Sequence, residues 1–156
     1  AGRITKSEQQ LEPDPRFNDM VLSKFINCLM HGGNKATATR VMYDALDLVE
    51  KRIKDEPPLD VFLRSIENLK PQVEVRSKRV GGATYQVPME VRPKRKQALA
   101  FRWMLDVARK KKGRPLAQRL AEEIIACYRR EGAAYTIREN VHKMAEANKA
   151  FAHFAW

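Results

Sequence analysis

The hydrophobic pattern of this chain changes from a helical to a strand period and back, which limits the folds it can adopt. Before Pro71 and after Pro93, apolar residues recur every three or four positions, as on one face of an α-helix. Over Val73–Val91, apolar and polar residues alternate on both sides of Gly81-Gly82, as in a β-hairpin with a glycine turn. The chain is therefore predicted to be mainly α, a bundle of about six helices with a β-hairpin inserted between the third and fourth helices.

Prolines, glycines and capping residues set the expected helix limits. The helices are expected over residues 18–30, over residues 35–53, from Pro58 to Pro71, from Pro93 to about residue 112, from Pro115 to Gly132, and from Thr136 onward. Asn18 is the expected N-cap of the first helix. Thr136–Glu139 fits a capping box for the last helix, whose apolar stripe would turn Met144 inward.

The hairpin combines an apolar root with a basic tip. We expect Val73 and Val75 to share one apolar face with the alternating apolar residues of the second strand. The ribbon should stand out from the helical body, because Arg76, Lys78 and Arg79 cannot be buried together.

The positive charge of the chain is confined to one stretch. Residues 76–114 hold 13 Lys or Arg residues against two acids, Glu90 and Asp106, which makes a net charge of +11. This equals the formal net charge of the whole chain, and the remaining residues balance with 17 basic and 17 acidic side chains. Because like charges repel, such a concentration indicates a polyanionic partner rather than a contribution to stability.

The first turn of the fourth helix carries Lys94, Arg95 and Lys96. Cations there oppose the helix dipole, at a cost of roughly 0.3–1 kcal/mol each at low salt. A local conflict of this kind is typical of a functional position.

The sequence contains no arrangement typical of catalysis or metal binding. Glu122-Glu123 is interpreted as a solvated helix face, and Gly81-Gly82 as a turn rather than a phosphate loop. Cys28 and Cys127 are expected to be small buried residues in a reducing compartment, with no ligand spacing to a histidine. We therefore predict that the chain is not an enzyme and has no catalytic residues, no metal site and no cofactor.

Among polyanions, a folded RNA fits better than DNA or an anionic membrane. No helix has the pattern of a recognition helix, and the basic helix uses its apolar stripe for the core rather than for a bilayer. On the hairpin, Tyr85 could stack on a base or pack within the hairpin, and Gln86 could bond base or ribose edges.

Three stretches carry a resemblance to a known family. Val73–Val91, Ala98–Arg109 and His142–Phe154 resemble the bacterial-type ribosomal small-subunit protein number seven, and residues 13–17 and 32–35 look like the same family. The resemblance extends over almost the whole chain, from Pro13 to Trp156.

The resemblance implies a structural constituent of the small ribosomal subunit. Such a protein binds the 3′ major domain of the small-subunit rRNA, nucleates assembly of the head and lies at the subunit interface near the tRNA exit site and the mRNA exit path. The implied partners are the rRNA, exit-site tRNA and mRNA, and the small-subunit proteins numbered nine and eleven.

The resemblance also implies site residues. The expected rRNA-binding residues are Lys35, Arg76, Lys78, Arg79, Arg92, Lys94, Arg95, Lys96, Arg102, Arg109, Lys110, Lys111, Lys112, Arg114, His142, Lys143 and Lys149. The part of the hairpin expected near tRNA and mRNA comprises Arg79, Gly81, Gly82, Tyr85 and Gln86.

The expected organisation is a single RNA-binding domain over residues 1–156. It would include a flexible N-terminal arm at 1–13, a projecting hairpin at 73–91 and a C-terminal tail at 150–156. We expect it in the ribosome of a bacterial cytoplasm or an organelle matrix, away from membranes. The rival hypothesis is a free-standing RNA-binding chaperone or translational regulator that uses the same surface.

Overall fold

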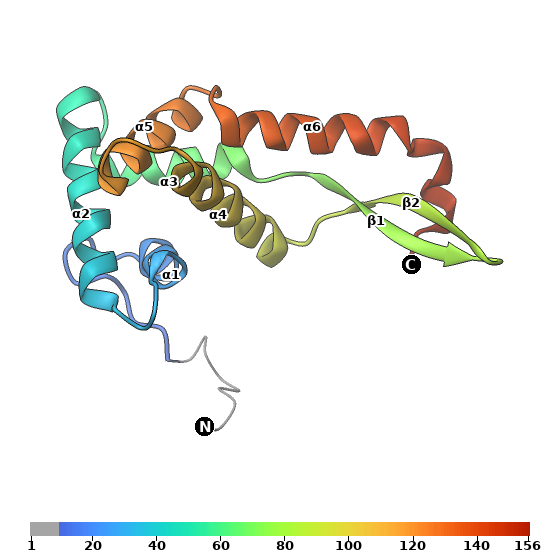
Figure 1. The fold of residues 1–156 in the computed structure, drawn as a ribbon, viewed down its shortest axis with the longest axis horizontal. Helices are drawn as coiled ribbons and strands as arrows, with labels where there is room; N and C mark the ends of the chain where they lie inside the picture. Colours follow the sequence, from blue (N-terminus) through green and yellow to red (C-terminus); the bar gives the residue numbers. More distant parts are fainter. Residues whose placement is uncertain (1–9) are drawn as a thin grey trace.

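The computed structural model describes residues 10–156, and residues 1–9 of the expected arm lie outside the described part. Its elements are α1 (Met20–Leu29), α2 (Lys35–Arg52), α3 (Pro58–Leu69), β1 (Val73–Val80), β2 (Ala83–Glu90), α4 (Pro93–Lys110), α5 (Leu116–Tyr128), α6 (Ala133–Ala147) and a 3₁₀ helix, η1 (Lys149–Phe154). The predicted class is confirmed: a mainly helical chain with an antiparallel hairpin between the third and fourth helices (Figure 1).

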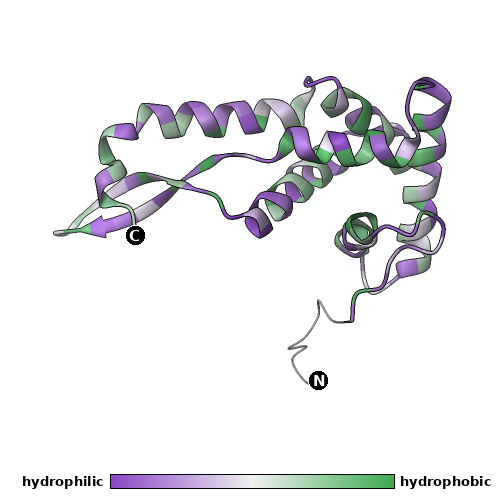
Figure 2. Ribbon diagram, turned by 180° about the vertical axis from the view of Figure 1, so that it is seen from behind, coloured by the Kyte–Doolittle hydropathy of each residue, from purple (hydrophilic) through white to green (hydrophobic). Residues whose placement is uncertain are grey.

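The core lies among α1 to α5, with α5 packed against α2, α3 and α4. The ring of Phe25 lies 5.0 Å from that of Phe62 and 5.1 Å from that of Phe101, between centroids, and joins α1, α3 and α4. Each such side chain stabilises the fold by roughly 1.5–3 kcal/mol when fully buried. Hydrophobic (green) and hydrophilic (purple) residues alternate along the helices of the body in Figure 2, as expected of amphipathic helices around one core.

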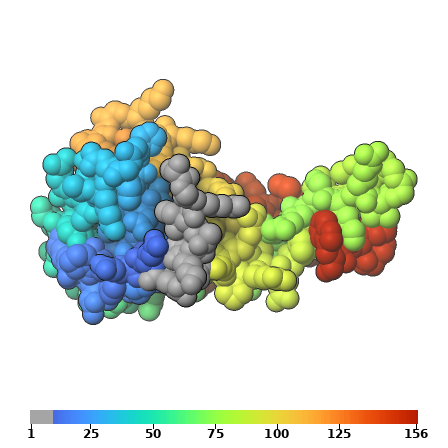
Figure 3. Space-filling model, turned by 90° about the horizontal axis from the view of Figure 1, so that it is seen from below, coloured from blue at the N-terminus to red at the C-terminus, as the bar shows by residue number. Residues whose placement is uncertain are grey.

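The hairpin projects from the helical body, but it does not stand alone. α6 leaves the body and runs beside β1, and η1 then folds back onto β2 (Figure 1). Figure 3 shows the hairpin and the C-terminal segment together as one protruding lobe. Because α6 extends beyond the body, Met144 is 54% exposed, and the expectation that it points inward is wrong.

The strand register places the apolar residues of the two strands on opposite faces. Glu74 pairs with Met89 and Arg76 with Val87, and paired residues share a face of an antiparallel ribbon. The expected common apolar face is therefore wrong, since Val73 and Val75 lie on the face opposite to Val87. The register follows from the tight turn at Gly81-Gly82, whose positive φ angles of 57° and 85° suit a two-residue hairpin loop.

Two predicted helix starts are also wrong. The N-cap of α1 is Asp19, whose carboxylate accepts a hydrogen bond from Leu22 N at 2.8 Å, whereas Asn18 precedes the helix with a φ of 53°. α6 begins at Ala133, one turn before the predicted capping box. Thr136 lies within its first turn, and its hydroxyl donates to the carbonyl of Gly132.

Glu123 is buried, so the interpretation of Glu122-Glu123 as a solvated face is wrong for this residue. Its side chain is 1% exposed and accepts hydrogen bonds from Lys111 Nζ at 3.3 Å and from the backbone N–H of Ala134 at 3.0 Å. The carboxylate thus joins α5 to the end of α4 and the start of α6. Glu122 lies nearer the surface and pairs with Arg114.

The two cysteines differ in exposure. Cys127 is buried as expected, but Cys28 near the end of α1 is exposed. Among the described residues, no helix combines the length and the apolar character needed to span a bilayer.

Candidate RNA-binding surface

The backbone and side chain of Gln72 join three elements at the root of the hairpin. Its backbone N–H donates to Nε2 of His142 in α6 at 3.0 Å, and its side-chain oxygen accepts from Lys96 Nζ in α4 at 3.2 Å. Its carbonyl accepts from Val91 N at the end of the hairpin. The hairpin is therefore oriented relative to α4 and α6 by the residue that precedes it.

Glu74 supplies the negative charge that the first turn of α4 lacks. Its side chain is only 12% exposed, and its carboxylate accepts hydrogen bonds from Arg95 Nε at 3.1 Å and from Arg76 Nε at 3.1 Å. The expected conflict between the cations and the helix dipole is thus partly offset by an anion from β1. Glu74 also fixes the direction in which Arg95 and Arg76 leave the surface.

Seven of the expected rRNA-binding residues are exposed and make no side-chain hydrogen bond or ion pair within residues 10–156. They are Lys35, Arg79, Arg92, Arg102, Lys110, Lys112 and Lys143. Lys35 lies at the start of α2, Arg79 at the hairpin tip and Lys143 in α6. The other four lie along α4 or directly beside its two ends. Cations that the protein does not neutralise itself are the ones available to phosphates.

Three of the expected residues hold the fold together. Arg109 donates to the carbonyl of Leu29 at 3.3 Å and so caps the end of α1. Lys111 pairs with buried Glu123, and Arg114 pairs with Glu122. The side chains of all three residues therefore already have partners within the chain, a carbonyl for Arg109 and a carboxylate for Lys111 and Arg114.

The expected residues of α6 have different environments. His142 acts as a hydrogen-bond acceptor for Gln72, and its pKa is lowered by burial and by the nearby charge of Arg138. Lys143 is exposed. Lys149, at the start of η1, pairs with Glu146 at 2.9 Å. His142 thus contributes to this surface as a neutral positioning group.

The C-terminal segment covers part of the hairpin. The ring of Tyr85 lies 5.2 Å from that of Phe151 and 4.8 Å from that of Phe154, between centroids. Lys78 donates to the carbonyl of Phe154 at 2.5 Å and lies 4.9 Å from the centroid of the Trp156 ring. Of the two interpretations of Tyr85, the structure therefore favours packing within the protein.

The remaining hairpin residues lie at or near its exposed end. Gly81 and Gly82 form the turn, and Arg79 is exposed beside it. Gln86 is exposed and donates to the hydroxyl of Ser77 across the ribbon at 2.8 Å. Arg79 is thus the hairpin cation with neither an ion pair nor a side-chain hydrogen bond in the described part.

Two basic residues were missed by sequence reasoning. Arg119 in α5 donates to the carbonyls of Ala108 and Lys111 and so caps the end of α4. Lys24 in α1 lies across a groove from Lys94 in α4. Neither residue belongs to a run of basic residues, which is why the charge pattern did not indicate them. For Lys24, its position outside the apolar stripe of its helix was the one available sign of a surface role.

The described residues contain no group of three or more histidine, cysteine or acidic side chains placed to hold a metal. Burial raises the pKa of the Cys127 thiol, and the adjacent Glu123 carboxylate raises it further. Although Cys28 is at the surface, partial desolvation raises the pKa of its thiol against the opposing charges of Lys24 and Arg109. A raised pKa keeps a thiol protonated and therefore a poor nucleophile.

The comparison with known proteins decides the family. Residues 2–149 match the family model for ribosomal protein S7p/S5e. The chain belongs to this family. The predicted assignment to the ribosomal small-subunit protein number seven family is confirmed, and with it a structural ribosomal protein rather than an enzyme.

The chain is similar to curated members of the family over nearly its whole length. It is 60% identical to small ribosomal subunit protein uS7 of Rhodopirellula baltica, covering 99% of both chains. It is 50% identical to the uS7 proteins of Desulfotalea psychrophila and Thermotoga maritima, covering 99% of this chain and 98% and 99% of those relatives.

Proposed function

We propose that this chain binds the 3′ major domain of the small-subunit rRNA directly, nucleates assembly of the head and lies near the tRNA exit site. The observation that carries this proposal is the set of seven exposed cations without ion pairs, spread over α2, the hairpin, α4 and α6. The family membership makes rRNA the polyanion, and the names of its relatives place those proteins in the small subunit.

The surface suits a folded RNA recognised by shape. Its cations come from four elements, and Gln72 and Glu74 fix three of them, the hairpin, α4 and α6, relative to one another. Phosphates on different strands of an RNA fold can therefore be met together. With roughly six phosphates neutralised, the logarithm of affinity should fall with the logarithm of salt concentration at a slope near −4 to −5.

The direct test is binding of the full chain to a 3′ major-domain rRNA fragment and to an arbitrary RNA of equal length, over a series of salt concentrations. Lys143→Glu should weaken binding to the fragment. It should also reduce the slope of log affinity against log salt by at least about 1, which is the change expected for one lost phosphate contact. The matched control is Lys54→Glu, at an exposed lysine between α2 and α3. Equal affinity for the two RNAs, or equal loss in both variants, would exclude the proposal.

The hairpin is proposed to reach toward exit-site tRNA and mRNA, with small-subunit proteins nine and eleven as neighbours. Arg79→Glu tests this part most cleanly, because Arg76 and Lys78 are already bonded within the chain. Reconstituted small subunits with Arg79→Glu should bind exit-site tRNA less well, while the melting temperature of the free protein is unchanged. Unchanged tRNA binding would contradict this role.

The free-standing chaperone or regulator is the second candidate, and the same exposed cations would serve it. Co-sedimentation with the small subunit at high salt distinguishes the two. A constituent of the subunit stays bound, whereas a transient regulator is released.

A further inference from the structure

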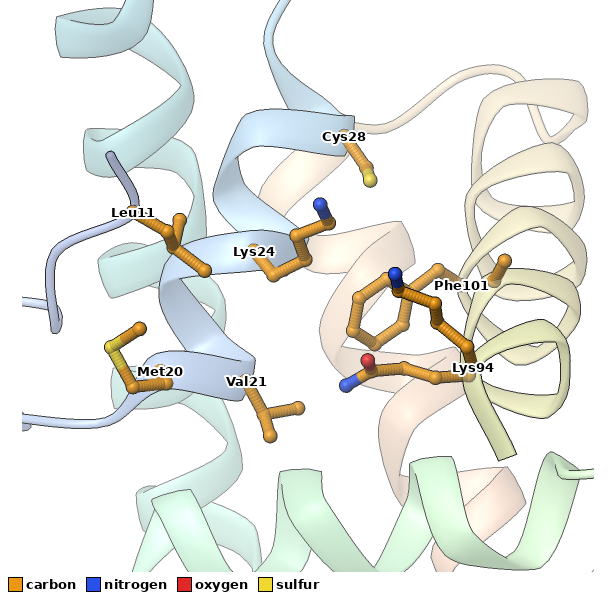
Figure 4. A pocket seen from close by; sticks show the side chains of 9 residues that line it. Leu11, Met20, Val21, Lys24, Cys28, Lys94 and Phe101 are labelled. Carbon is orange, nitrogen blue, oxygen red and sulfur yellow. The ribbon is translucent and has the colours of Figure 1, made fainter. Parts of the chain in front are cut away.

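An apolar groove between α1 and α4 adjoins the proposed rRNA-binding surface, and its outer wall is not covered by the core packing described above. Its volume is about 390 Å³, within the 300–1,000 Å³ usual for small-ligand sites. Leu11 and Met20 form one wall (Figure 4), and Phe101 of α4 lines the groove from the core side, where it is 3% exposed. Met20 is 42% exposed, so this apolar surface is open to a ligand.

Two cations border this apolar space. Lys24 extends into it from α1 and Lys94 from α4, as Figure 4 shows. None of the nine lining residues, all of them in the described part of the chain, carries a carboxylate. The groove therefore favours an apolar group that has negative charge beside it.

The groove also offers one group able to read a polar edge. Gln97 lines it, and its side-chain amide can both donate and accept hydrogen bonds. Gln97 directly follows the basic first turn of α4, so the groove continues the surface that we assign to the rRNA.

We propose that the groove between α1 and α4 takes one unstacked base of the bound rRNA. The base would lie against the exposed side chain of Met20, Gln97 would bond its edge, and Lys24 would contact a flanking phosphate. A nucleotide in a chain is planar and apolar on its faces, polar on its edge and anionic on both sides, which matches each feature of the groove. This inference rests on the proposed function, since it requires rRNA to be bound.

The first experiment detects the base directly. The full chain is labelled with ¹³C in its methionine methyl groups and titrated with the 3′ major-domain rRNA fragment. A base over Met20 should shift its methyl signal upfield by the ring current, while the buried Met42 and Met104 stay unchanged. Inorganic polyphosphate, which has the charges but no bases, should not produce this shift. An unmoved Met20 signal, or the same shift with polyphosphate, would overturn the proposal.

The second experiment fills the groove. Ala98 is exposed on α4 and lines the groove, so Ala98→Trp should occupy it without disturbing the core. Binding to the rRNA fragment should weaken by roughly fivefold or more, the lower end of the range for losing one base contact, and the Met20 shift should disappear. Ala133→Trp, at an exposed alanine at the start of α6, is the matched control and should bind as the unmodified chain does. If Ala98→Trp does not fold, Ala98→Leu serves with the same readouts.

The third experiment separates base from phosphate contacts. Lys24→Met should reduce the salt slope by roughly one, as for a lost phosphate contact. Gln97→Leu should weaken binding without changing the slope. Identical effects of the two variants on the slope would contradict the assigned roles.

The outcomes also separate this inference from the proposed function. If the unmodified chain does not prefer the rRNA fragment, the proposed function fails. If it prefers the fragment while Ala98→Trp binds equally well, only the base-binding groove fails. Normal RNA binding by Ala98→Trp combined with its exclusion from assembled small subunits would assign the groove to a side chain of a partner protein instead.

Discussion

Nε2 of His142 accepts a hydrogen bond from the backbone N–H of Gln72 at 3.0 Å, and this bond fastens α6 to the root of the hairpin. A histidine can accept at Nε2 only when that nitrogen carries no proton, so the interaction requires the neutral imidazole. Burial and the charge of Arg138 lower the pKa of His142, against a smaller opposing effect of Glu139. The junction of the hairpin with α4 and α6 at Gln72 is therefore expected to weaken at acidic pH.

We predict that the free energy of unfolding falls as the pH decreases below about 6.5, in part because of His142. Its folded pKa lies below the ordinary value, so the unfolded chain binds more protons in this range. The contribution of His142 is present above its unfolded pKa of about 6.5 and is lost as the pH falls through its folded pKa. Urea unfolding at pH 7.5 and at pH 5.5 measures the difference.

His142→Gln should reduce the loss of stability between these two pH values, because glutamine does not titrate. The matched control is His31→Gln, at an exposed histidine between α1 and α2, which should leave the pH dependence as in the unmodified chain. The same reduction in both variants would show that the Gln72 interaction is not responsible.

Removal of the Glu123 carboxylate should destabilise the protein. Glu123→Ala leaves the buried N–H of Ala134 without its acceptor, at a cost of roughly 1–3 kcal/mol. Glu122→Ala is the matched control, since it loses a pair with the exposed Arg114, worth roughly 0–1 kcal/mol. Chemical denaturation of both variants measures this, and equal losses would contradict the role assigned to Glu123.

Gly132→Ala should be more destabilising than Gly113→Ala. Both positions have positive φ, 99° and 90°, a conformation that costs a residue with a side chain roughly 1–3 kcal/mol. At Gly132 an added Cβ would also lie 2.8 Å from the Cβ of Ala126 and 3.0 Å from the Glu123 carboxylate, whereas at Gly113 it meets nothing within 4 Å. Melting temperatures of the two variants test whether this crowding adds to the backbone strain.

Loss of the Phe154 ring should loosen the hairpin without unfolding the body. The Tyr85–Phe154 contact is an aromatic pair of the kind worth roughly 0.5–1.5 kcal/mol, and neither ring belongs to the hydrophobic core of the helical body. Phe154→Ala should therefore speed amide hydrogen exchange in β2 while amides in α5 exchange as before. Ala152→Ser, at an exposed residue of the same 3₁₀ helix, is the control. Uniformly faster exchange would mean that the segment stabilises the whole domain.

Much of the fold could be predicted because local periodicity and turn chemistry agree with it. The strand pattern around Gly81-Gly82 predicted the hairpin to within one residue of its observed limits, and Pro58 and Pro93 begin helices as expected. The faces of the hairpin could not be predicted in the same way. Alternation in each strand is visible in the sequence, but whether Val75 and Val87 share a face depends on the register that the turn imposes.

In the candidate site, too, some features could be predicted from the sequence and others depended on the tertiary structure. The excess of positive charge over residues 76–114 is a property of the sequence. The sequence could not separate Arg109 and Lys111, which bond within the fold, from Arg102 and Lys112, which are exposed, because their partners lie in α1 and α5. Burial of Glu123 was missed for the same reason, since its acceptor role depends on the distant N–H of Ala134.

The sequence alone determined the helical class, the place of the hairpin, the concentrated positive charge and, through its motifs, the family. These depend on the order of residue types along the chain, which is a local property. Only the tertiary structure decided which cations are exposed, which residues hold the hairpin against α4 and α6, and that Lys24 and Lys94 border one groove. Those facts depend on contacts between residues far apart in the chain, and packing of the helices around a common core brings them together.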